Sequence, residues 1–437
     1  MIWLRFQCCQ DKHAVKRQFH RWRYLIRTRS FPNHFAVTAL TWALLVAGAA
    51  VFIHRLLSLG AVFGDSPVDF GYFYYAANLV WHHGSPSHLY DIGREHRWML
   101  AYLSGITPVH PYDQYIYPPQ FAVLLAWVAA FAPHTASIIW YALSTVFYLS
   151  SIGFLCTIIK SNHWRILFLS IALMFSPYGS DLMLGNVDWL IFSLLSLSLY
   201  LYRNRNMRLI AGIVVGISIV LKITPILFLF LGLAKKDWRY TWGVVASLIA
   251  TTTLSFLVVG FEPFRYYLTH FLSMSALSAK NALIYGPGWN SSLSVLLPEL
   301  SGTSFLFYLA DALILFVTFK AVRKPPSDSL RNYALVSVCM LLISPVVEDH
   351  HLIILLFSIV YVIRTLETVE GFGPLWHRVR LTILSILLVL STAVGPSTVY
   401  NAVIPLHYLV AMVGFFIWIA FFPPEGRETK LSMVSPE

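Results

Sequence analysis

The sequence predicts an all-α polytopic integral membrane protein, and two features support this prediction. Hydrophobic residues make up 57% of the 437 positions and charged residues only 12%. Apolar stretches of roughly 17–25 residues, long enough to span a bilayer, recur between residues 36 and 422 with short polar connections. We expect about eleven to thirteen membrane segments in a single domain, because no connection is long enough to fold as a soluble unit.

The first element is a basic tail over residues 1–34, followed by a membrane helix near 36–57. The tail carries eight Lys or Arg residues and a single acid, Asp11. Positive charge next to a first helix is typical of the cytoplasmic side, so we predict a cytoplasmic N-terminus. The same bias accounts for the net charge of +11 without a nucleic-acid partner. The four cysteines lack metal-ligand spacing, and we expect no disulfide framework.

The next element is a long connection, 60–117, which we assign to the first external loop. It is acidic and rich in aromatic residues, and its stretch Tyr72 to Trp81 is expected to lie along the interface as a short helix. Asp69 stands at its start within an apolar and aromatic run. A carboxylate at a membrane face is poorly solvated, and such residues are candidates for function.

The remaining apolar segments continue to residue 422. Prolines at positions 225 and 345 interrupt two of them, and broken helices are tolerated where they line a cavity. The last stretch, 423–437, is polar, and we expect it to be disordered. We expect these segments at about 118–133, 136–159, 166–177, 188–202, 209–221, 225–234, 241–261, 303–319, 332–347, 351–363, 381–398 and 402–422.

Four basic clusters between the segments predict the topology. If the clusters near residues 203–208, 235–239, 320–331 and 364–380 all face the cytoplasm, the hairpins between them point outward. Their polar tips at 185–188, 222–225, 286–290 and 348–351 then share the face that carries Asp69. Placing Lys160 and Arg165 in the cytoplasm does not fit a simple count of three crossings from residue 36 to 160. A re-entrant segment 118–133 is one solution, and this part of the topology stays open.

Asp69 is the candidate general base. A displacement at a sugar carbon needs one group to remove a proton from the attacking hydroxyl, and a carboxylate suits that task. The alternative is a structural one, since aspartate is also a favoured helix cap. Residue types alone leave both interpretations open.

The polar tips supply the candidate binding groups. Lys222 suits an anionic leaving group, with a snorkelling lysine as the alternative. His350 and His351 suit phosphate binding or proton relay, with interfacial polar residues as the alternative. The candidates for hydrogen bonds to a sugar, with turn chemistry as the alternative, are Asn186, Asp188 and Asn290.

Several sites are missing from the sequence. It has no phosphate-cradling P-loop, no dinucleotide-binding glycine pattern and no Asp-x-Asp motif, so a soluble nucleotide-sugar donor is not expected. No residue is assigned to a metal, because the histidine spacing is not that of a zinc motif. No cofactor is predicted, and the need for a divalent metal stays open.

Five stretches, in their order along the chain, resemble one family. The chain resembles the polyprenyl-phosphate-mannose-dependent mannosyltransferases of glycosyltransferase family 87, which have the GT-C fold, over roughly residues 36–422. Where that family often has Gly-Gln-x-Asn, this chain has Gly185-Asn186-Val187-Asp188. The similar stretches are Asp69-Phe70 to Ala76-Ala77 with Leu89-Tyr90-Asp91, Tyr117-Pro118-Pro119, Lys222-Ile223-Thr224-Pro225, Asn290-Ser291-Ser292-Leu293, and Ser344-Pro345 with His350-His351.

The resemblance implies a GT-C-like catalytic domain over residues 35–422 and an inverting transfer with Asp69 as base. The sugar is a hexose, with mannose as the first choice, and it passes from a polyprenyl-phosphate-sugar to a lipid-linked glycan or glycolipid among the membrane lipids. Tyr74 and Tyr75 join the substrate-binding set. We expect the bacterial inner membrane, with the active site on the periplasmic face. The rival interpretation is a transporter or lipid-glycan flippase, which would place its polar groups near the midplane between repeats.

Overall fold

The structure is a computed structural model. It describes residues 34–62, 68–103, 114–272, 292–294, 297, 305–325, 328–368, 382, 386 and 404–421. These residues form helices and turns and include no strand, in agreement with the predicted all-α class. Asn290 and both chain tails, 1–33 and 422–437, lie outside the described residues, as do the tip 286–290 and nearly all of the segment expected at 381–398.

Six helical stretches of the described chain are long and apolar enough to cross a membrane. Six shorter apolar helices accompany them, and the predicted total of eleven to thirteen segments stays a prediction. The long stretches contain α2 (His34–Val62), α6 (Pro133–Ile158), α7 (Asn162–Met174) with α8 (Ser176–Leu184), α12 (Trp238–Val259), α17 (Phe305–Arg323), and η6 (Asp349–Leu355) with α19 (Leu356–Thr368). The shorter ones contain α5 (Pro119–Leu125) with η2 (Ala126–Ala130), α9 (Asp188–Tyr202), α10 (Arg208–Leu221), η4 (Thr224–Ile226) with α11 (Leu227–Lys235), α18 (Ser329–Leu342) and α21 (Ile404–Phe421).

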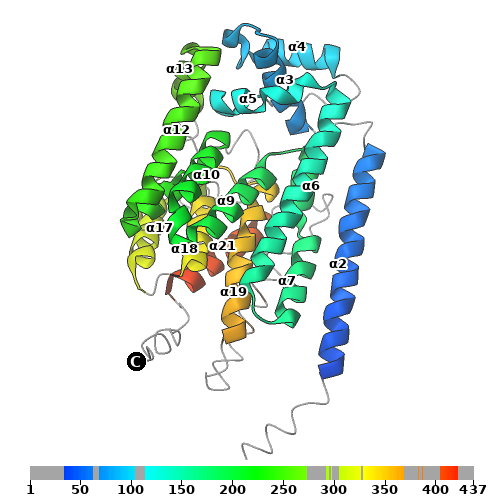
Figure 1. Ribbon diagram of the computed structural model, residues 1–437, viewed down its shortest axis with the longest axis vertical. Coiled ribbons are helices and arrows are strands. Elements are labelled where there is room, and N and C mark those ends of the chain that lie inside the picture. The colour runs from blue at the N-terminus through cyan, green and yellow to red at the C-terminus, as the bar shows by residue number, and fades with distance from the viewer. Residues whose placement is uncertain are drawn as a thin grey trace, which may run out of the picture.

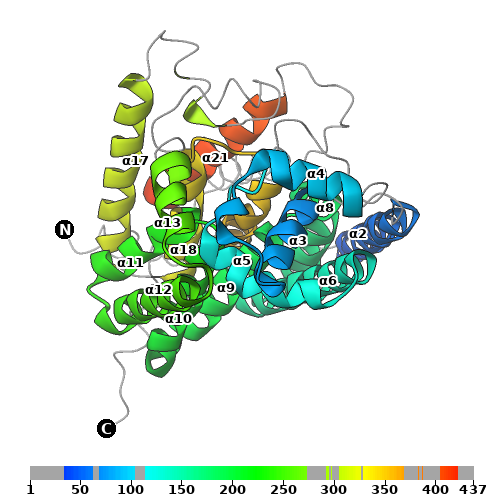
Figure 2. The same cartoon turned by 90° about the horizontal axis from the view of Figure 1, so that it is seen from above.

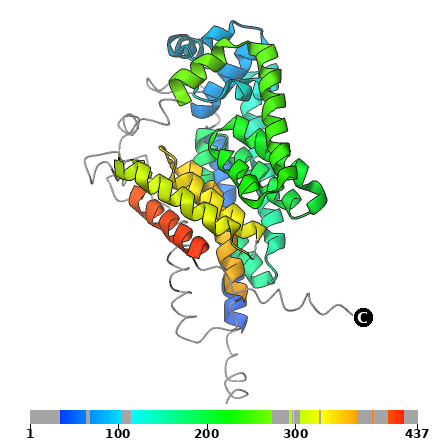
Figure 3. The ribbon, with the colours of Figure 1, turned by 90° about the vertical axis from the view of Figure 1, so that its left-hand side faces the viewer.

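The core surrounds α18, in which every residue from Leu330 to Leu342 is buried. A mostly apolar helix that is buried on all sides is stable only inside such a bundle. It packs against α9, α11, α17, α19, α21 and η6. Figure 3 shows α17 and α21 lying side by side along one flank of the bundle. The opposite flank is α2, which packs on α7 and sends Arg55 to the carbonyl oxygens of Met174 and Phe175 at 3.0 and 2.9 Å.

Glycines bring α10 and α12 into close contact. A Cβ added to Gly212 would lie 2.0 Å from the backbone oxygen of Tyr240, and one added to Gly243 would lie 2.1 Å from that of Leu209. A Cβ added to Gly216 would lie 2.5 Å from the Cβ of Ser247. Gly212 and Gly216 therefore serve helix packing, since only small residues let two backbones approach this closely.

Both predicted proline breaks are present. Helix α10 ends at Leu221, and Pro225 lies in the short turn η4 before α11. Pro345 lies between the end of α18 and η6. Proline lacks an N–H donor and disfavours helical backbone before it, which explains both interruptions. Each break leaves polar residues at the end of a helix rather than inside one.

A helical cap covers one end of the bundle. Figure 1 shows its helices gathered at the top, and Figure 2 views them from above. Buried Glu95 of α4 accepts the backbone N–H of Tyr115 at 3.2 Å and so ties the cap to the chain that enters α5. Burial raises the pKa of Glu95 well above its usual value, and the N–H bond opposes this shift. The cap consists of α3 (Val68–Trp81), η1 (Pro86–His88), α4 (Ile92–Tyr102), α5, α13 (Glu262–Tyr266) and the π-helical turn η5 (Tyr267–Leu272).

The expectation for residues 72–81 needs a correction. A helix is present and begins at Val68, but residues 70–77 are buried by the rest of the cap. An interfacial helix keeps one polar face in water. Residues 72–77 have no such face, because all of them are buried, so this part packs as an interior helix.

Candidate functional site

Asp69 and Asn186 meet at the junction between the cap and the bundle. Asp69 lies in the first turn of α3, and its Oδ2 accepts a hydrogen bond of 2.7 Å from Nδ2 of Asn186. Asn186 Oδ1 accepts the Val187 N–H at 2.6 Å and the Tyr117 hydroxyl at 3.4 Å. Because these two donors occupy the oxygen side of the amide, its NH₂ group faces Asp69. The amide therefore holds the carboxylate in one orientation.

Tyr117 forms the aromatic wall of this junction. Its ring stacks on Phe121 at 4.8 Å and meets Phe73 edge-on at 4.9 Å. Burial raises the pKa of the Tyr117 hydroxyl well above its usual value, and the charges of Asp69 and Asp188 add to the shift. Tyr117 therefore stays a neutral hydrogen-bond donor at physiological pH.

Asp188 begins α9 and is the centre of a second set of charges. Lys222 follows the last residue of α10 and has an extended backbone. Its Nζ donates to both carboxylate oxygens of Asp188 at 3.1 and 3.0 Å. The Asp188 side chain is 8% exposed and that of Lys222 is 17% exposed. A buried charge needs such a partner, and the pair neutralises both. The predicted alternative for Lys222, a snorkelling side chain, does not describe this geometry.

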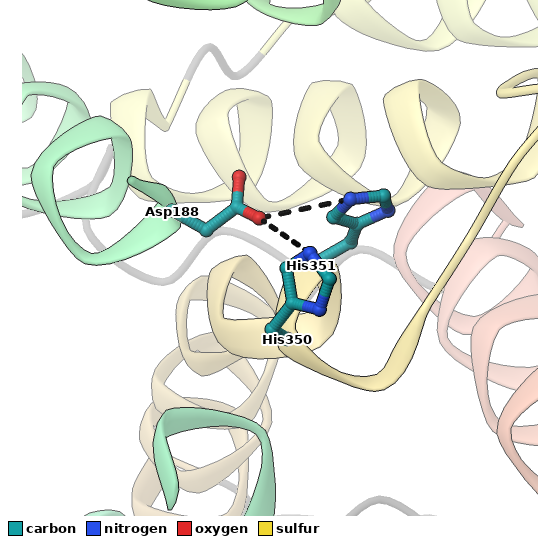
Figure 4. Close-up of side chains that lie close together, drawn as sticks. All are labelled: Asp188, His350 and His351. Carbon is teal, nitrogen blue, oxygen red and sulfur yellow. Dashed lines mark ion pairs between the residues drawn. The ribbon is translucent and has the colours of Figure 1, made fainter. Parts of the chain in front are cut away.

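The two histidines approach the same carboxylate from η6, as Figure 4 shows. Asp188 Oδ2 lies 3.6 Å from His350 Nε2 and 3.7 Å from His351 Nε2. His351 Nδ1 accepts the backbone N–H of Glu348 at 3.2 Å, so in the neutral ring the proton is on Nε2. The capping box of η6 fixes the His351 ring, because its Nδ1 accepts the Glu348 N–H, and the His350 ring lies across it at 4.3 Å between ring centroids.

Asp181 is a buried carboxylate that the sequence reasoning missed. Its oxygens accept the backbone N–H groups of Asp188 and Trp189 at 3.2 and 3.3 Å, which caps the start of α9. Gly185, in the left-handed conformation with φ of 65°, turns the chain from α8 to bring Asp181 back onto α9. The available signal was an acidic residue between the apolar segments 166–177 and 188–202.

Tyr74 and Tyr75 are not brought to these charges. The Tyr74 hydroxyl donates to the Phe131 carbonyl at 2.8 Å, and the Tyr75 hydroxyl donates to the His88 carbonyl at 3.0 Å. Both rings lie against Trp98 of α4. Their predicted contact with substrate stays a prediction. In the structure both residues stabilise the cap.

Asp188, His350 and His351 have the donor types of a metal site. One ligand atom from each lies within 4.8 Å of the others. However, Lys222 already bonds both oxygens of Asp188, and a divalent cation there would face the ammonium group. The same groups also suit an anion, because Lys222 and the Nε2–H group of His351 are donors. The geometry favours the anion.

The chain is similar to known proteins over part of its length. A family model described as glycosyltransferase family 87 matches residues 115–345, more than half of the chain. The matched range includes Tyr117, Asn186, Asp188 and Lys222, whereas Asp69 and the two histidines lie outside it. No solved structure matches this chain.

Three curated relatives are similar to part of the chain. A polyprenol-phosphate-mannose-dependent alpha-(1-2)-phosphatidylinositol pentamannoside mannosyltransferase of Mycolicibacterium smegmatis is 26% identical over 223 residues, 48% of this chain and 54% of the relative. A polyprenol-phosphate-mannose-dependent alpha-(1-2)-phosphatidylinositol mannoside mannosyltransferase of Mycobacterium tuberculosis is 24% identical over 263 residues, 56% and 61% of the two chains. A third, a pentamannoside enzyme of M. tuberculosis, is 27% identical over 276 residues, 60% and 62%. The chain thus spans less than two thirds of each relative.

Proposed function

Because the chain belongs to glycosyltransferase family 87, we propose that it transfers a hexose, with mannose as the first choice, from a polyprenyl-phosphate-sugar to a lipid-anchored glycan or glycolipid. One observation carries this proposal. Four segments far apart in sequence come together at this site. One group is Asp69 with Asn186, and the other is Lys222 with the two histidines around Asp188. A base and an anion-binding group side by side are what such a transfer needs.

In the proposed reaction, Asp69 accepts the proton of the acceptor hydroxyl. The hydroxyl oxygen attacks the anomeric carbon from the side opposite the phosphate, and a new glycosidic bond forms. The bond from the anomeric carbon to the phosphate oxygen breaks, and the polyprenyl phosphate leaves with the electron pair. The configuration inverts, and a general acid is unnecessary because the leaving group is a stable anion.

Lys222, His350 and His351 would stabilise the departing phosphate. Lys222 is held next to the site by both oxygens of Asp188. Donors that are already oriented stabilise developing negative charge without reorganising during the reaction. Asp188 then acts as the counter-ion that positions the three donors, rather than as a group that contacts sugar.

The proposed location is the bacterial inner membrane, with the N-terminus in the cytoplasm and the site at the periplasmic face. Support comes from the arrangement of the basic clusters in the sequence. The clusters near 203–208 and 235–239 lie at one end of α10 and α12, and Lys222 lies at the other end of α10. Positive residues favour the cytoplasmic side of a membrane protein. Residues 35–422 then form the catalytic domain.

The test is sugar transfer by the purified protein in detergent, with polyprenyl-phosphate-mannose as donor and membrane lipid extract as acceptor. We expect Asp69→Asn to lose roughly 10²–10⁴-fold in rate, because the amide accepts no proton. The matched control is Asp91→Asn, an exposed N-cap of α4 in the same cap, which should transfer normally. Undiminished transfer by Asp69→Asn would remove the base assignment, and binding of the donor without any transfer by the wild type would favour a transporter or flippase.

A further inference from the structure

A second polar cavity lies at the far end of α10 from Lys222. It has a volume of about 360 Å³ and opens where α11 gives way to α12. Figure 2 shows α10, α11 and α12 grouped together, away from the cap helix α4. Helix α10 has 14 residues, so the two sites are separated by roughly 20 Å along its axis. The cavity plays no part in the proposed transfer.

The lining of this cavity is strongly basic. It includes Arg208, Lys235, Lys236 and Arg239, against one acid, Asp237. Asp237 is already neutralised, because its Oδ2 lies 2.7 Å from Arg208 Nη1. No ion pair holds the other three cations among the residues that the structure describes.

Buried Arg331 adds to the positive charge. Its guanidinium donates to the carbonyl oxygens of Ala321, Ile419 and Ala420, and its charge repels that of Lys235. Carbonyl oxygens satisfy the N–H groups but do not cancel the charge. Arg331 therefore adds to the positive charge that Lys235 brings to the cavity.

Lys236 occupies a backbone conformation that normally favours glycine. Its φ is 54°, and its N–H closes the end of α11 on the Leu233 carbonyl at 3.1 Å. Glycine adopts this conformation without the clash that a Cβ causes. A lysine here therefore places a cation at the cavity mouth at some conformational cost.

Two tryptophans mark the level of the cavity in the membrane. Trp238 and Trp242 lie one turn apart on the outer face of α12 and are 58% and 61% exposed. Tryptophan collects at the membrane–water interface, where phospholipid head groups lie. Basic pockets between membrane helices at this level suit anionic head groups.

We propose that this cavity binds a phosphate ester, namely the phosphate of an anionic phospholipid head group. Arg208, held by Asp237, and Lys235 would form the inner wall, and Lys236 and Arg239 the mouth. A cavity of this size accommodates a phosphate and its glycerol, while the acyl chains follow the apolar surface of α12.

The experiment measures by native mass spectrometry how much phosphatidylglycerol the full-length protein retains in neutral detergent. Retention of phosphatidylcholine is measured in the same way for comparison. The variant combines Lys235→Gln, Lys236→Asn and Arg239→Gln, in which asparagine tolerates the left-handed backbone. We expect at least about a tenfold loss of affinity for phosphatidylglycerol and little change for phosphatidylcholine. The control removes three cations elsewhere, with Lys320→Gln, Arg323→Gln and Lys324→Gln, and should bind as the wild type does.

Equal binding of phosphatidylglycerol by the two triple variants would overturn the proposal, as would equal wild-type affinities for the two lipids. If the cavity variant fails to fold, the single change Arg239→Glu at the exposed mouth replaces it and should weaken binding in the same direction. Competition by inorganic phosphate separates two sources of the ligand. Displacement of the lipid would indicate a site for phosphate itself, and retention would indicate that the lipid as a whole is recognised. Sugar transfer is not a readout, so this result is independent of the proposed function.

Discussion

At the scale of single residues, the two carboxylates of the site are held differently. Asp188 is buried, and Lys222 occupies both of its oxygens. Asp69 is half-buried, and one of its oxygens accepts from the Asn186 amide. Because both Asp188 oxygens already accept from the Lys222 ammonium group, this carboxylate positions the cation. Asp69 therefore stays the proposed proton acceptor.

Asn186 is predicted to position this base rather than to bind sugar. We expect Asn186→Leu to move the acidic limb of the pH–rate profile to higher pH by about one to two units. A carboxylate that loses a hydrogen-bond donor holds its proton more tightly, and a bond to a charged group is worth about 1.5–3 kcal/mol. The measurement is kcat/KM for transfer between pH 4 and 9.

Tyr117→Phe is the matched control for Asn186→Leu. It removes only the 3.4 Å bond to the oxygen side of the amide and leaves the NH₂ group on Asp69. Its profile should keep the wild-type limb. A lower rate for Asn186→Leu with an unmoved limb would return Asn186 to the substrate-binding set.

At the scale of elements, the close crossing of α10 and α12 fixes the position of α10 in the bundle. The crossing depends on glycine, because backbone atoms of one helix occupy the space of a missing Cβ on the other. Helix α10 places Lys222 at one end and Arg208 at the other. A change in the crossing would therefore move both the candidate active site and the basic cavity.

Gly212→Ala is predicted to destabilise the protein by about 1–3 kcal/mol, since the added methyl group would lie 2.0 Å from a backbone oxygen. Gly153→Ala in α6 is the control, because a Cβ there meets nothing within 4 Å. Alanine is the better helix former, so this control should be neutral or stabilised by up to about 1 kcal/mol. Thermal unfolding in detergent measures both, and equal midpoints would argue against the crossing.

At the scale of the whole molecule, polar groups collect at two levels separated by apolar helices. One level holds Asp69, Asp188 and the residues around them beneath the cap. The other holds the basic cavity at the start of α12. The 22 residues of α12 extend roughly 33 Å, about the thickness of a bilayer core. The basic cavity at the start of α12 and the cap at its end are therefore expected on opposite sides of the membrane.

Single cysteines are predicted to report this sidedness. In a variant without native cysteines, His82→Cys at the exposed end of α3 should react with a membrane-impermeant maleimide in intact spheroplasts. Arg239→Cys, exposed at the cavity mouth, should react only after permeabilisation. Positive-inside orientation is the reason for this direction. The reverse pattern would invert the proposed topology, and labelling of both in intact cells would contradict a full crossing between them.

Much of the fold was accessible from local signals in the sequence. Apolar segments of spanning length, the breaks at Pro225 and Pro345, and the packing glycines 212 and 216 each follow from properties of a few neighbouring residues. The same signals misjudged residues 72–81. An aromatic run fits an interfacial helix and a buried one equally well, and only the neighbours from α4, α5 and η2 decide between them.

By itself, the sequence determined that this chain is a helical membrane protein with a few polar residues at the ends of its helices, because membrane spans and helix breaks are local properties. Tertiary structure alone decided which of those residues meet. The Asn186 amide reaches Asp69 across 117 positions, Lys222 and two histidines share Asp188, and Tyr74 and Tyr75 turn into the cap. The physical reason is that hydrogen bonds and ion pairs join side chains according to their distance in space, and helix packing sets that distance.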